Sequence, residues 1–150
     1  MDAGSQAELR RLWHALGGQR RAVKELPRFA ALHALSPIET GTLDVVAEAE
    51  GVTMGEVGRA LGLAKSTVTS LVDRLEGRGY LCRVAGARDR RAFGLVLTPR
   101  GRTAYRAHVR FEDEVGRRML AGLESDAERA GFLAALRKMV AGLERAGRHA

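Results

Sequence analysis

Two short helical patterns that follow each other almost without a gap constrain the fold of this chain most. Thr53 and Glu56 have the spacing of a capping box, and the helical pattern that they open ends at Gly62. A second helix is predicted over residues 64–77, because apolar residues recur there at i, i+3, i+4 and i+7. These residues are Val68, Leu71, Val72 and Leu75. Two short helices joined by a tight turn indicate a helix-turn-helix.

The period of the pattern changes after the second helix. Residues at spacing two alternate within 80–84 and again within 93–97, which predicts two strands. The alternating residues are Tyr80, Cys82 and Val84 in the first segment and Phe93, Leu95 and Leu97 in the second. Residues 85–92, here called the wing, are a polar tip that completes a β-hairpin. A hairpin directly after a helix-turn-helix predicts a winged helix-turn-helix.

Longer helical patterns flank this motif on both sides. The first runs from about residue 6 toward residue 26, where Pro27 interrupts it, and carries an apolar stripe. Three further helices are predicted from a capping Ser or Thr that has proline directly after it, glutamate three residues later, or both. These starts are Ser36 with Pro37 and Glu39, Thr98 with Pro99, and Ser125 with Glu128. Six helices and one hairpin result, without a long linker. The predicted fold is mainly α with a small β-hairpin wing (α+β).

The surplus positive charge of the chain is local. Of 25 Lys and Arg and 18 Asp and Glu, residues 51–110 hold twelve basic and four acidic side chains, so the two flanks together are nearly neutral. A basic block between neutral flanks predicts an anionic partner for the middle segment, of which nucleic acid is the commonest kind. A solvated basic face without a partner is the alternative.

The outward face of the helix predicted over 64–77 suits contact with DNA bases. Ser66 and Ser70 lie opposite the apolar stripe, so the face is small and able to form hydrogen bonds near its start. Asp73 and Glu76 lie toward the other end, so the helix is expected to enter a major groove N-terminus first. Lys65 adds a phosphate contact at the positive end of the helix dipole. The expected contacts are Lys65, Ser66, Thr67, Thr69, Ser70 and Arg74. An exposed polar face without a ligand is the alternative.

The wing concentrates arginine around one carboxylate, in Arg88, Asp89, Arg90 and Arg91. Three guanidinium groups this close repel one another unless they meet an anion. A narrow minor groove has the enhanced negative potential that attracts inserted arginine. We therefore expect the wing, residues 85–92, to contact a minor groove, with a solvated basic turn as the alternative.

The stretch from Leu35 to Arg102 resembles the MarR (multiple antibiotic resistance regulator) family. The resemblance lies in the order of three motifs: LGLAKSTVTSLVDRLEGRGY, RDRRA and LTPRGR. It implies a homodimeric transcription regulator, usually a repressor, that binds a pseudo-palindromic operator in double-stranded DNA. It also implies that Arg91 enters the minor groove and that Arg74 lies near the DNA backbone or Asp89. Ala64 departs from the family, which often has Ser or Thr there.

The domain organisation follows from the resemblance together with the patterns. Residues 35–99 are expected to form the winged helix-turn-helix lobe, and residues 1–34 and 100–150 a helical dimerisation region. The terminal helices are amphipathic and nearly neutral in charge, which suits packing against a second copy of the chain. A monomer that closes these helices on its own core is the alternative.

The resemblance also implies a small aromatic or anionic effector between the dimer helices and the lobe. The candidate residues for that site, each with core packing as its alternative, are Trp13, Phe29, His33 and Tyr105. His108 and Glu112 share a helix face and, together with His14 or His33, are residue types that bind metals, but without cysteine ligands no metal site is predicted. Cys82 is expected to be a structural thiol and not a redox sensor.

Several other function classes are excluded. The chain has no P-loop, G-x-G-x-x-G, G-x-S-x-G or H-E-x-x-H motif, so neither an enzyme nor a cofactor is predicted. Residues 29–35, the longest apolar stretch, are too short to cross a membrane, and a lone cysteine fits a reducing cytoplasm. The remaining alternative to an operator-binding regulator is an architectural or RNA-binding winged-helix protein without sequence specificity.

Overall fold

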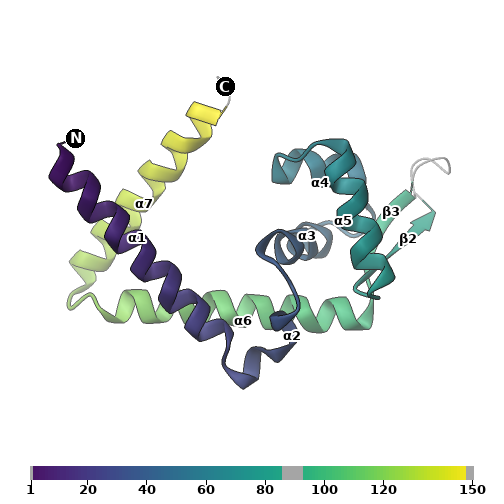
Figure 1. Ribbon diagram of the computed structural model, residues 1–150, viewed down its shortest axis with the longest axis horizontal. Helices are drawn as coiled ribbons and strands as arrows, with labels where there is room; N and C mark the ends of the chain where they lie inside the picture. The colour runs from purple at the N-terminus through teal and green to yellow at the C-terminus, as the bar shows by residue number, and fades with distance from the viewer. Residues whose placement is uncertain (1, 86–92, 148–150) are drawn as a thin grey trace. The chain divides into compact units, whose positions relative to one another are not determined.

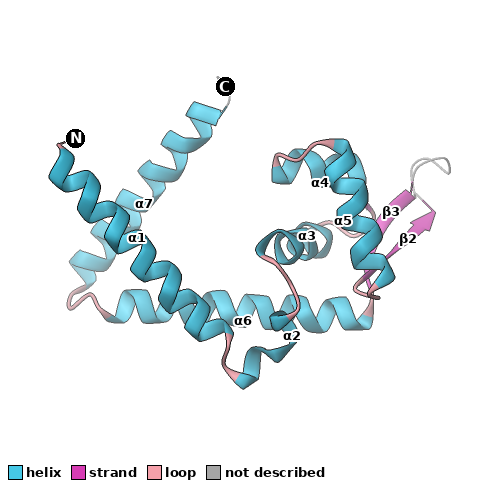
Figure 2. Ribbon diagram, viewed as in Figure 1, coloured by secondary structure: helices cyan, strands magenta, loops and turns pink. Residues whose placement is uncertain are grey.

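The computed structural model describes residues 2–85 and 93–147 (Figure 1). Helices predominate and the strands are few and short (Figure 2), which confirms the predicted fold class. In chain order the elements are α1 (Ala3–Lys24), the 3-10 helix η1 (Pro27–Phe29), α2 (Ala30–His33), α3 (Pro37–Glu48), β1 (Val52–Thr53), α4 (Met54–Leu61), α5 (Lys65–Gly77), β2 (Leu81–Ala85), β3 (Phe93–Leu97), α6 (Pro99–Ala121) and α7 (Asp126–Gly147).

The predicted helix starts are confirmed by their hydrogen bonds. The backbone N–H of Ser36 donates to Glu39 at 2.8 Å and that of Thr53 donates to Glu56 at 2.8 Å, with the reciprocal bonds also formed. Ser125 and Glu128 exchange the same pair of bonds before α7. Each box satisfies amide groups that a helix start leaves without an intrahelical acceptor. Local sequence therefore decides where these helices begin.

The sheet differs from the predicted hairpin. It has three antiparallel strands in the order β1-β3-β2, because β1 pairs with β3 through Val52 opposite Leu95. A two-residue strand is too short to produce an alternating pattern, so nothing in the sequence signals it. The close approach explains Gly94, where an added Cβ would lie 2.7 Å from the carbonyl oxygen of Gly51. The short helical turns of η1 and α2, after Pro27, also lie outside what the sequence predicts.

The inward face of β2 also differs from the prediction. Leu81 is buried and pairs with Leu97, whereas Cys82 is half-buried and Val84 is exposed. In β2 the residue that packs into the core is therefore Leu81, which is not one of the alternating residues Tyr80, Cys82 and Val84 that predicted the strand. Tyr80 is buried, but it precedes the strand. The prediction for β3 is right at Leu95 and Leu97, while Phe93 lies beyond the core and is exposed.

The contacts divide the chain into two units, residues 1–112 and 113–150. The first unit contains a core in which side chains from α3, α4, α5, the sheet and α6 are almost fully excluded from solvent. Its members include Leu43, Val46, Val57, Val68, Leu71, Val72, Leu75, Leu81, Leu95 and Ala104. The predicted stripe of α5 therefore faces this core. That packing leaves the opposite face of α5 at the surface.

The second unit contains the end of α6 and α7, and no described residue of α7 is buried. Its apolar side chains recur at helical spacing and remain exposed: Leu133, Leu136, Met139, Val140 and Leu143. In the first unit, α1 carries a similar exposed stripe of Leu9, Leu12, Trp13 and Leu16. Within the described residues, no helix has the length and apolar character needed to cross a membrane.

Candidate nucleic-acid interface

Helix α5 is held in the first unit by a tight turn from α4 and by the wing strand β2 (Figure 1). Gly62 ends α4 with a φ of 65°, which suits glycine. Gly58 allows the two helices to approach, because an added Cβ would lie 3.2 Å from the carbonyl oxygen of Leu63 and 3.3 Å from a methyl group of Val68. The turn and the apolar stripe together fix which side of α5 is exposed.

The first half of α5 presents polar groups at the surface. Lys65, Ser66, Thr67 and Ser70 are exposed. Thr69 is half-buried, and its hydroxyl donates to the carbonyl oxygen of Lys65 at 3.0 Å. Ala64 occupies the N-cap position and provides no side-chain hydrogen bond, so no side chain caps the amide donors of the first turn. The structure brings a lysine, several hydroxyl groups and these amides together at one helix end.

Arg74 lies at the other end of α5 and contacts α3. Its Nε atom lies 3.2 Å from Oε1 of Glu39, and Arg78 reaches the same oxygen at 3.0 Å. Burial acts to raise the pKa of Glu39, but hydrogen bonds from Ser36 and the charges of Arg78 and Arg74 outweigh it and hold that pKa below its ordinary value. Arg74 therefore has a partner inside the lobe that the sequence did not indicate.

Arg83 on β2 is a second arginine whose role the sequence did not indicate. Its guanidinium group contacts the carboxylates of both Asp73 and Glu76 on α5, and its backbone N–H donates to Glu76 at 3.0 Å. The hydrogen bond to Asp73 raises the pKa of Arg83, against the opposing effect of burial and with the charge of Glu76 adding to it. The one indication in the sequence is that Asp73 and Glu76 are acidic residues at i and i+3 on the same helix face. Such a pair favours a cation from another element of the fold.

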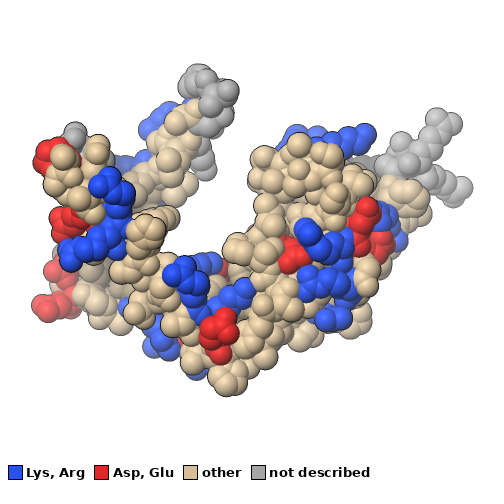
Figure 3. Space-filling view, in the orientation of Figure 1, with Lys and Arg blue, Asp and Glu red and all other residues tan. Residues whose placement is uncertain are grey.

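Two further arginines act within the lobe at the start of α6. The guanidinium of Arg100 lies 4.4 Å from the ring centroid of Tyr80, and Arg102 donates to the carbonyl oxygen of Leu97 at 2.6 Å. Figure 3 shows acidic side chains among the basic ones on the visible face of the first unit. Some of the arginines in residues 51–110 therefore already contact groups within the protein. The count of basic residues in the sequence overestimates the positive charge that is available to a partner.

The wing residues Arg88, Asp89, Arg90 and Arg91 lie outside the described residues. The strands on either side of the wing are described, and they pair from Leu81 opposite Leu97 to Ala85 opposite Phe93. Near this end of the ladder Val84 and Phe93 are exposed. The predicted contacts of the wing with DNA stay predictions.

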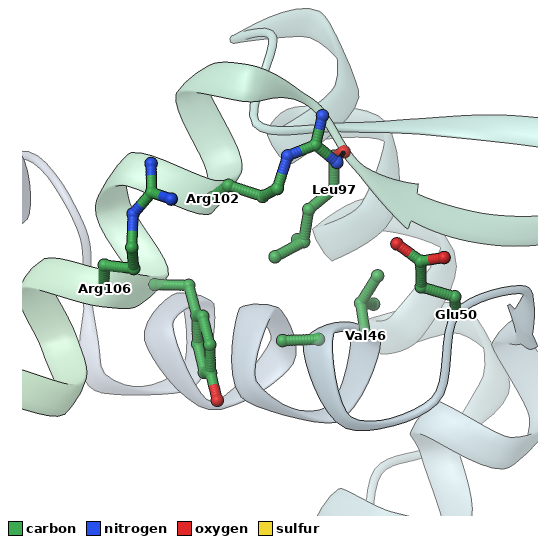
Figure 4. Close-up of a pocket in the computed structure, with 7 residues that line it drawn as sticks. Val46, Glu50, Leu97, Arg102 and Arg106 are labelled. Carbon is green, nitrogen blue, oxygen red and sulfur yellow. Dashed lines mark hydrogen bonds between the residues drawn. The ribbon is translucent and has the colours of Figure 1, made fainter.

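One candidate effector residue, Tyr105, lines a cavity of about 260 Å³ in the first unit. The remaining lining residues are Val46, Ala47, Glu50, Leu97, Arg102 and Arg106. Figure 4 shows Arg102 and Arg106 projecting from α6, with Glu50 across the cavity in the turn that follows α3. The apolar wall and the arginines could hold a small molecule with an apolar body and an acidic group.

The other three candidate effector residues do not line this cavity. Phe29 is buried, and its ring packs edge-on against Phe111 with centroids 5.6 Å apart. His33 is exposed, and Nε2 of its ring lies 2.9 Å from the carbonyl oxygen of Lys24. Trp13 is 69% exposed on α1. The structure therefore does not gather the four residues around the cavity that Tyr105 lines.

His108 and Glu112 form part of a polar network between three helices. Nδ1 of His108 lies 3.0 Å from Asp44 on α3, Nε2 lies 3.1 Å from Glu112, and Arg20 on α1 forms two hydrogen bonds with Glu112. The hydrogen bond to Asp44 raises the pKa of His108, although burial opposes it. Among the described residues no group of His, Cys, Asp and Glu is arranged to hold a metal ion.

Residues 33–92 match a sequence model of the MarR family. YcgE of Bacillus subtilis, an uncharacterised HTH-type transcriptional regulator, is 40% identical over 83 residues, which are 54% of this chain and 51% of YcgE. TtmR of Methylorubrum extorquens, another HTH-type transcriptional regulator, is 36% identical over 89 residues, which are 59% of this chain and 43% of TtmR. The chain thus spans about half the length of these curated relatives, and both are named as regulators, not enzymes.

Solved structures resemble the chain over more of its length. FabT of Streptococcus pneumoniae in complex with DNA is 28% identical, covers 94% of this chain and 95% of its own, and has a TM-score of 0.77. PcaV of Streptomyces coelicolor in complex with its natural ligand is 27% identical, covers 72% of this chain and 76% of its own, and has a TM-score of 0.57. Both likenesses agree with a winged-helix fold.

Proposed function

We propose that this chain, whose residues 33–92 match the MarR family, is a homodimeric transcription regulator. In this proposal it binds a specific DNA sequence and represses transcription until a small molecule releases it. The observation that carries the proposal is the exposed polar half of α5, whose opposite side is packed into the lobe. FabT, a similar protein, was solved with DNA. This combination favours sequence reading over an architectural or RNA-binding role.

The proposed contacts with DNA are divided between two grooves. The first half of α5 enters the major groove, where Ser66 and Ser70 contact base edges, and Lys65 with the uncapped amides contacts a phosphate. Thr67 and Thr69 flank these contacts. The wing enters the minor groove with Arg91, oriented by Asp89, and Arg88 and Arg90 add positive charge to the same segment. Arg74, already paired with Glu39, supports the lobe more than it contacts DNA.

The proposed dimer places the exposed apolar stripes of α1 and α7 against a second copy. Leu12 is 50% exposed, Met139 53% and Leu143 72%, so burial of these stripes on association removes apolar surface from water. Residues 1–34 and 100–150 then form the dimerisation region and residues 35–99 the DNA-binding lobe. A dimer would present two copies of α5 to half-sites about one helical turn, roughly 34 Å, apart.

The proposed effector site is the cavity between α3, β3 and α6. Tyr105 and the apolar side chains of Val46 and Leu97 provide the wall, and the guanidinium of Arg106 is suited to an acidic group. A small aromatic acid fits this chemistry. Trp13, Phe29 and His33 stay predictions as effector contacts. PcaV, which was solved with its natural ligand, supports the idea of a small effector.

The experiment measures binding of the full chain to the DNA that flanks its own gene, by fluorescence anisotropy at several salt concentrations. We expect tight binding that random duplex does not displace, and a steep fall of log affinity with log salt. Ser66→Ala and Ser70→Ala should change sequence preference, whereas Ser5→Ala, an exposed serine on α1, should not. Equal displacement by random duplex or RNA would instead support the architectural or RNA-binding alternative.

A further inference from the structure

We propose that Arg83 is a positioning residue that fixes the wing strand β2 against α5. The wing and α5, the helix proposed to read the major groove, then contact DNA as one rigid unit. This inference rests on the proposed function, because it concerns how the two DNA contacts are held relative to each other. Arg83 itself does not contact DNA in this proposal. It acts through the two elements that it joins.

The contacts of Arg83 converge on one side of α5. Asp73 and Glu76 are three residues apart, so they lie next to each other on the helix surface. The two terminal nitrogens of Arg83 bond to different carboxylates, while its backbone N–H donates to Glu76 at 3.0 Å. The same side chain lies 4.0 Å from the sulfur of Met54 at the start of α4. A planar guanidinium held at several points restrains direction as well as distance.

Arg83 is also the last anchored position of β2 before the wing. It pairs with Leu95, which is fully buried, and its own side chain is only 25% exposed. Beyond it, Val84 and Ala85 are exposed, and so is Phe93 opposite Ala85. Within the described part of β2, Arg83 is therefore the last residue whose side chain is held against the lobe, whereas β3 is also held at Gly94, which is buried and pairs with Thr53 of β1.

The charges around Arg83 argue against a direct contact with phosphate. One guanidinium lies between two carboxylates, so the cluster has a net negative charge and does not attract a DNA backbone. Lys65 differs, since no ion pair with another described residue engages it. Loss of Arg83 would leave two like charges one helical turn apart, which repel each other and nearby phosphates. Its presence thus both joins β2 to α5 and compensates these acids.

The test compares Arg83→Gln, Arg91→Ala and the double variant in the full chain. By itself Arg91→Ala should weaken DNA binding about tenfold or more, because a minor-groove arginine is lost. In the Arg83→Gln background the same change should weaken binding only about twofold, because the wing is no longer held in place. Multiplying losses would overturn the proposal.

A measurement without DNA keeps this inference separate from the proposed function. Amide hydrogen exchange is measured on the free wild-type protein and on Arg83→Gln. In the variant, residues 81–85 and 93–97 should exchange faster than in the wild type, while α3 and α6 should exchange at unchanged rates. Arg100→Gln is the control, because it also removes one arginine charge, from a side chain that contacts the ring of Tyr80. Residues 81–85 and 93–97 should stay protected from exchange in this variant. If Arg83→Gln fails to fold, Asp73→Asn tests the same contact. If hydrogen exchange of the two strands is the same in Arg83→Gln as in the wild type, the positioning role is overturned. If the exchange changes but the wild-type protein binds no DNA, only the proposed function is overturned.

Discussion

The winged-helix lobe and α7 use their apolar residues in opposite ways. In the lobe, Leu71, Val72 and Leu75 on α5 are at most 1% exposed, because they lie in a core where α4 and β2 contact α5. On α7, Leu136, Val140 and Leu143 follow a similar helical spacing but are 41% to 72% exposed. The same kind of pattern therefore has two outcomes within one chain.

The difference teaches that periodicity specifies an apolar face but not what covers it. The lobe has enough elements to close a core from its own residues, as its buried side chains show. Helix α7 has no such set in its own unit, where only the end of α6 accompanies it. We therefore attribute the lobe's stability to its own packing, and the proposed dimer would cover the apolar face of α7 with a second copy. Each prediction below tests one side of this contrast.

The largest expected effect is a loss of lobe stability in Leu71→Ala. Removal of a fully buried leucine leaves a cavity, so the free energy of unfolding should fall by about 2–5 kcal/mol. Urea denaturation followed by circular dichroism measures it. The loss should be the same at low and high protein concentration, and a loss that depends on concentration would show that the lobe is not self-sufficient.

The second prediction concerns Leu136→Asp on the apolar side of α7. A carboxylate at the centre of the proposed dimer interface should prevent association, with a dissociation constant raised at least about a hundredfold. Light scattering after size-exclusion chromatography measures the mass. Ala134→Asp, at an exposed position on the opposite side of the same helix, is the matched control. A Leu136→Asp protein that stays dimeric would contradict the proposed interface.

The third prediction returns to the lobe and to its buried carboxylate. Glu39→Gln removes the charge that both Arg74 and Arg78 contact, so the free energy of unfolding should fall by about 1–3 kcal/mol. Glu48→Gln, on the exposed end of the same helix, should have almost no effect. Thermal unfolding of both variants beside the wild type measures the difference. Equal behaviour of the two variants would mean that the Glu39 contacts add no stability.

The smallest effect is a pH dependence from His108, where α3 and α6 meet. Because folding raises the pKa of His108, protonation stabilises the folded state. That contribution is fully present below the ordinary pKa of about 6.5 and is lost as pH rises through the raised value. In the wild type, the free energy of unfolding should fall as the pH rises above about 6. In His108→Gln this fall should be smaller than in the wild type, by up to about 1 kcal/mol. An unchanged pH profile would contradict this assignment.

The sequence predicted the local elements of the chain well. The capping boxes at Ser36, Thr53 and Ser125 and the stripe of α5 depend on residues within one or two turns of each other. Such signals are complete in the sequence itself. The same holds for the exposed face of α5 that carries Ser66 and Ser70, because it is defined as the side opposite the stripe. The winged-helix fold followed from the order of these elements.

The pairing of β1, the phase of β2 and the partners of the arginines could not be predicted in this way. Val52 and Leu95 are distant in sequence, and a two-residue strand has no period of its own. Leu81 and not Cys82 faces the core because β2 must match the register of β3. The sequence showed twelve basic residues in one segment, but it did not show which of them meet carboxylates within the lobe.

The sequence by itself determined the helices, their caps, the apolar faces and the resemblance of residues 33–92 to the MarR family, since these depend on residue type and near-neighbour spacing. Tertiary structure alone decided that Glu39 pairs with Arg78, that Asp44 meets His108 and that Arg20 reaches Glu112. Those pairs lie 39, 64 and 92 residues apart. A charged side chain takes its partner from whichever element packs against it, and packing is a property of the whole fold.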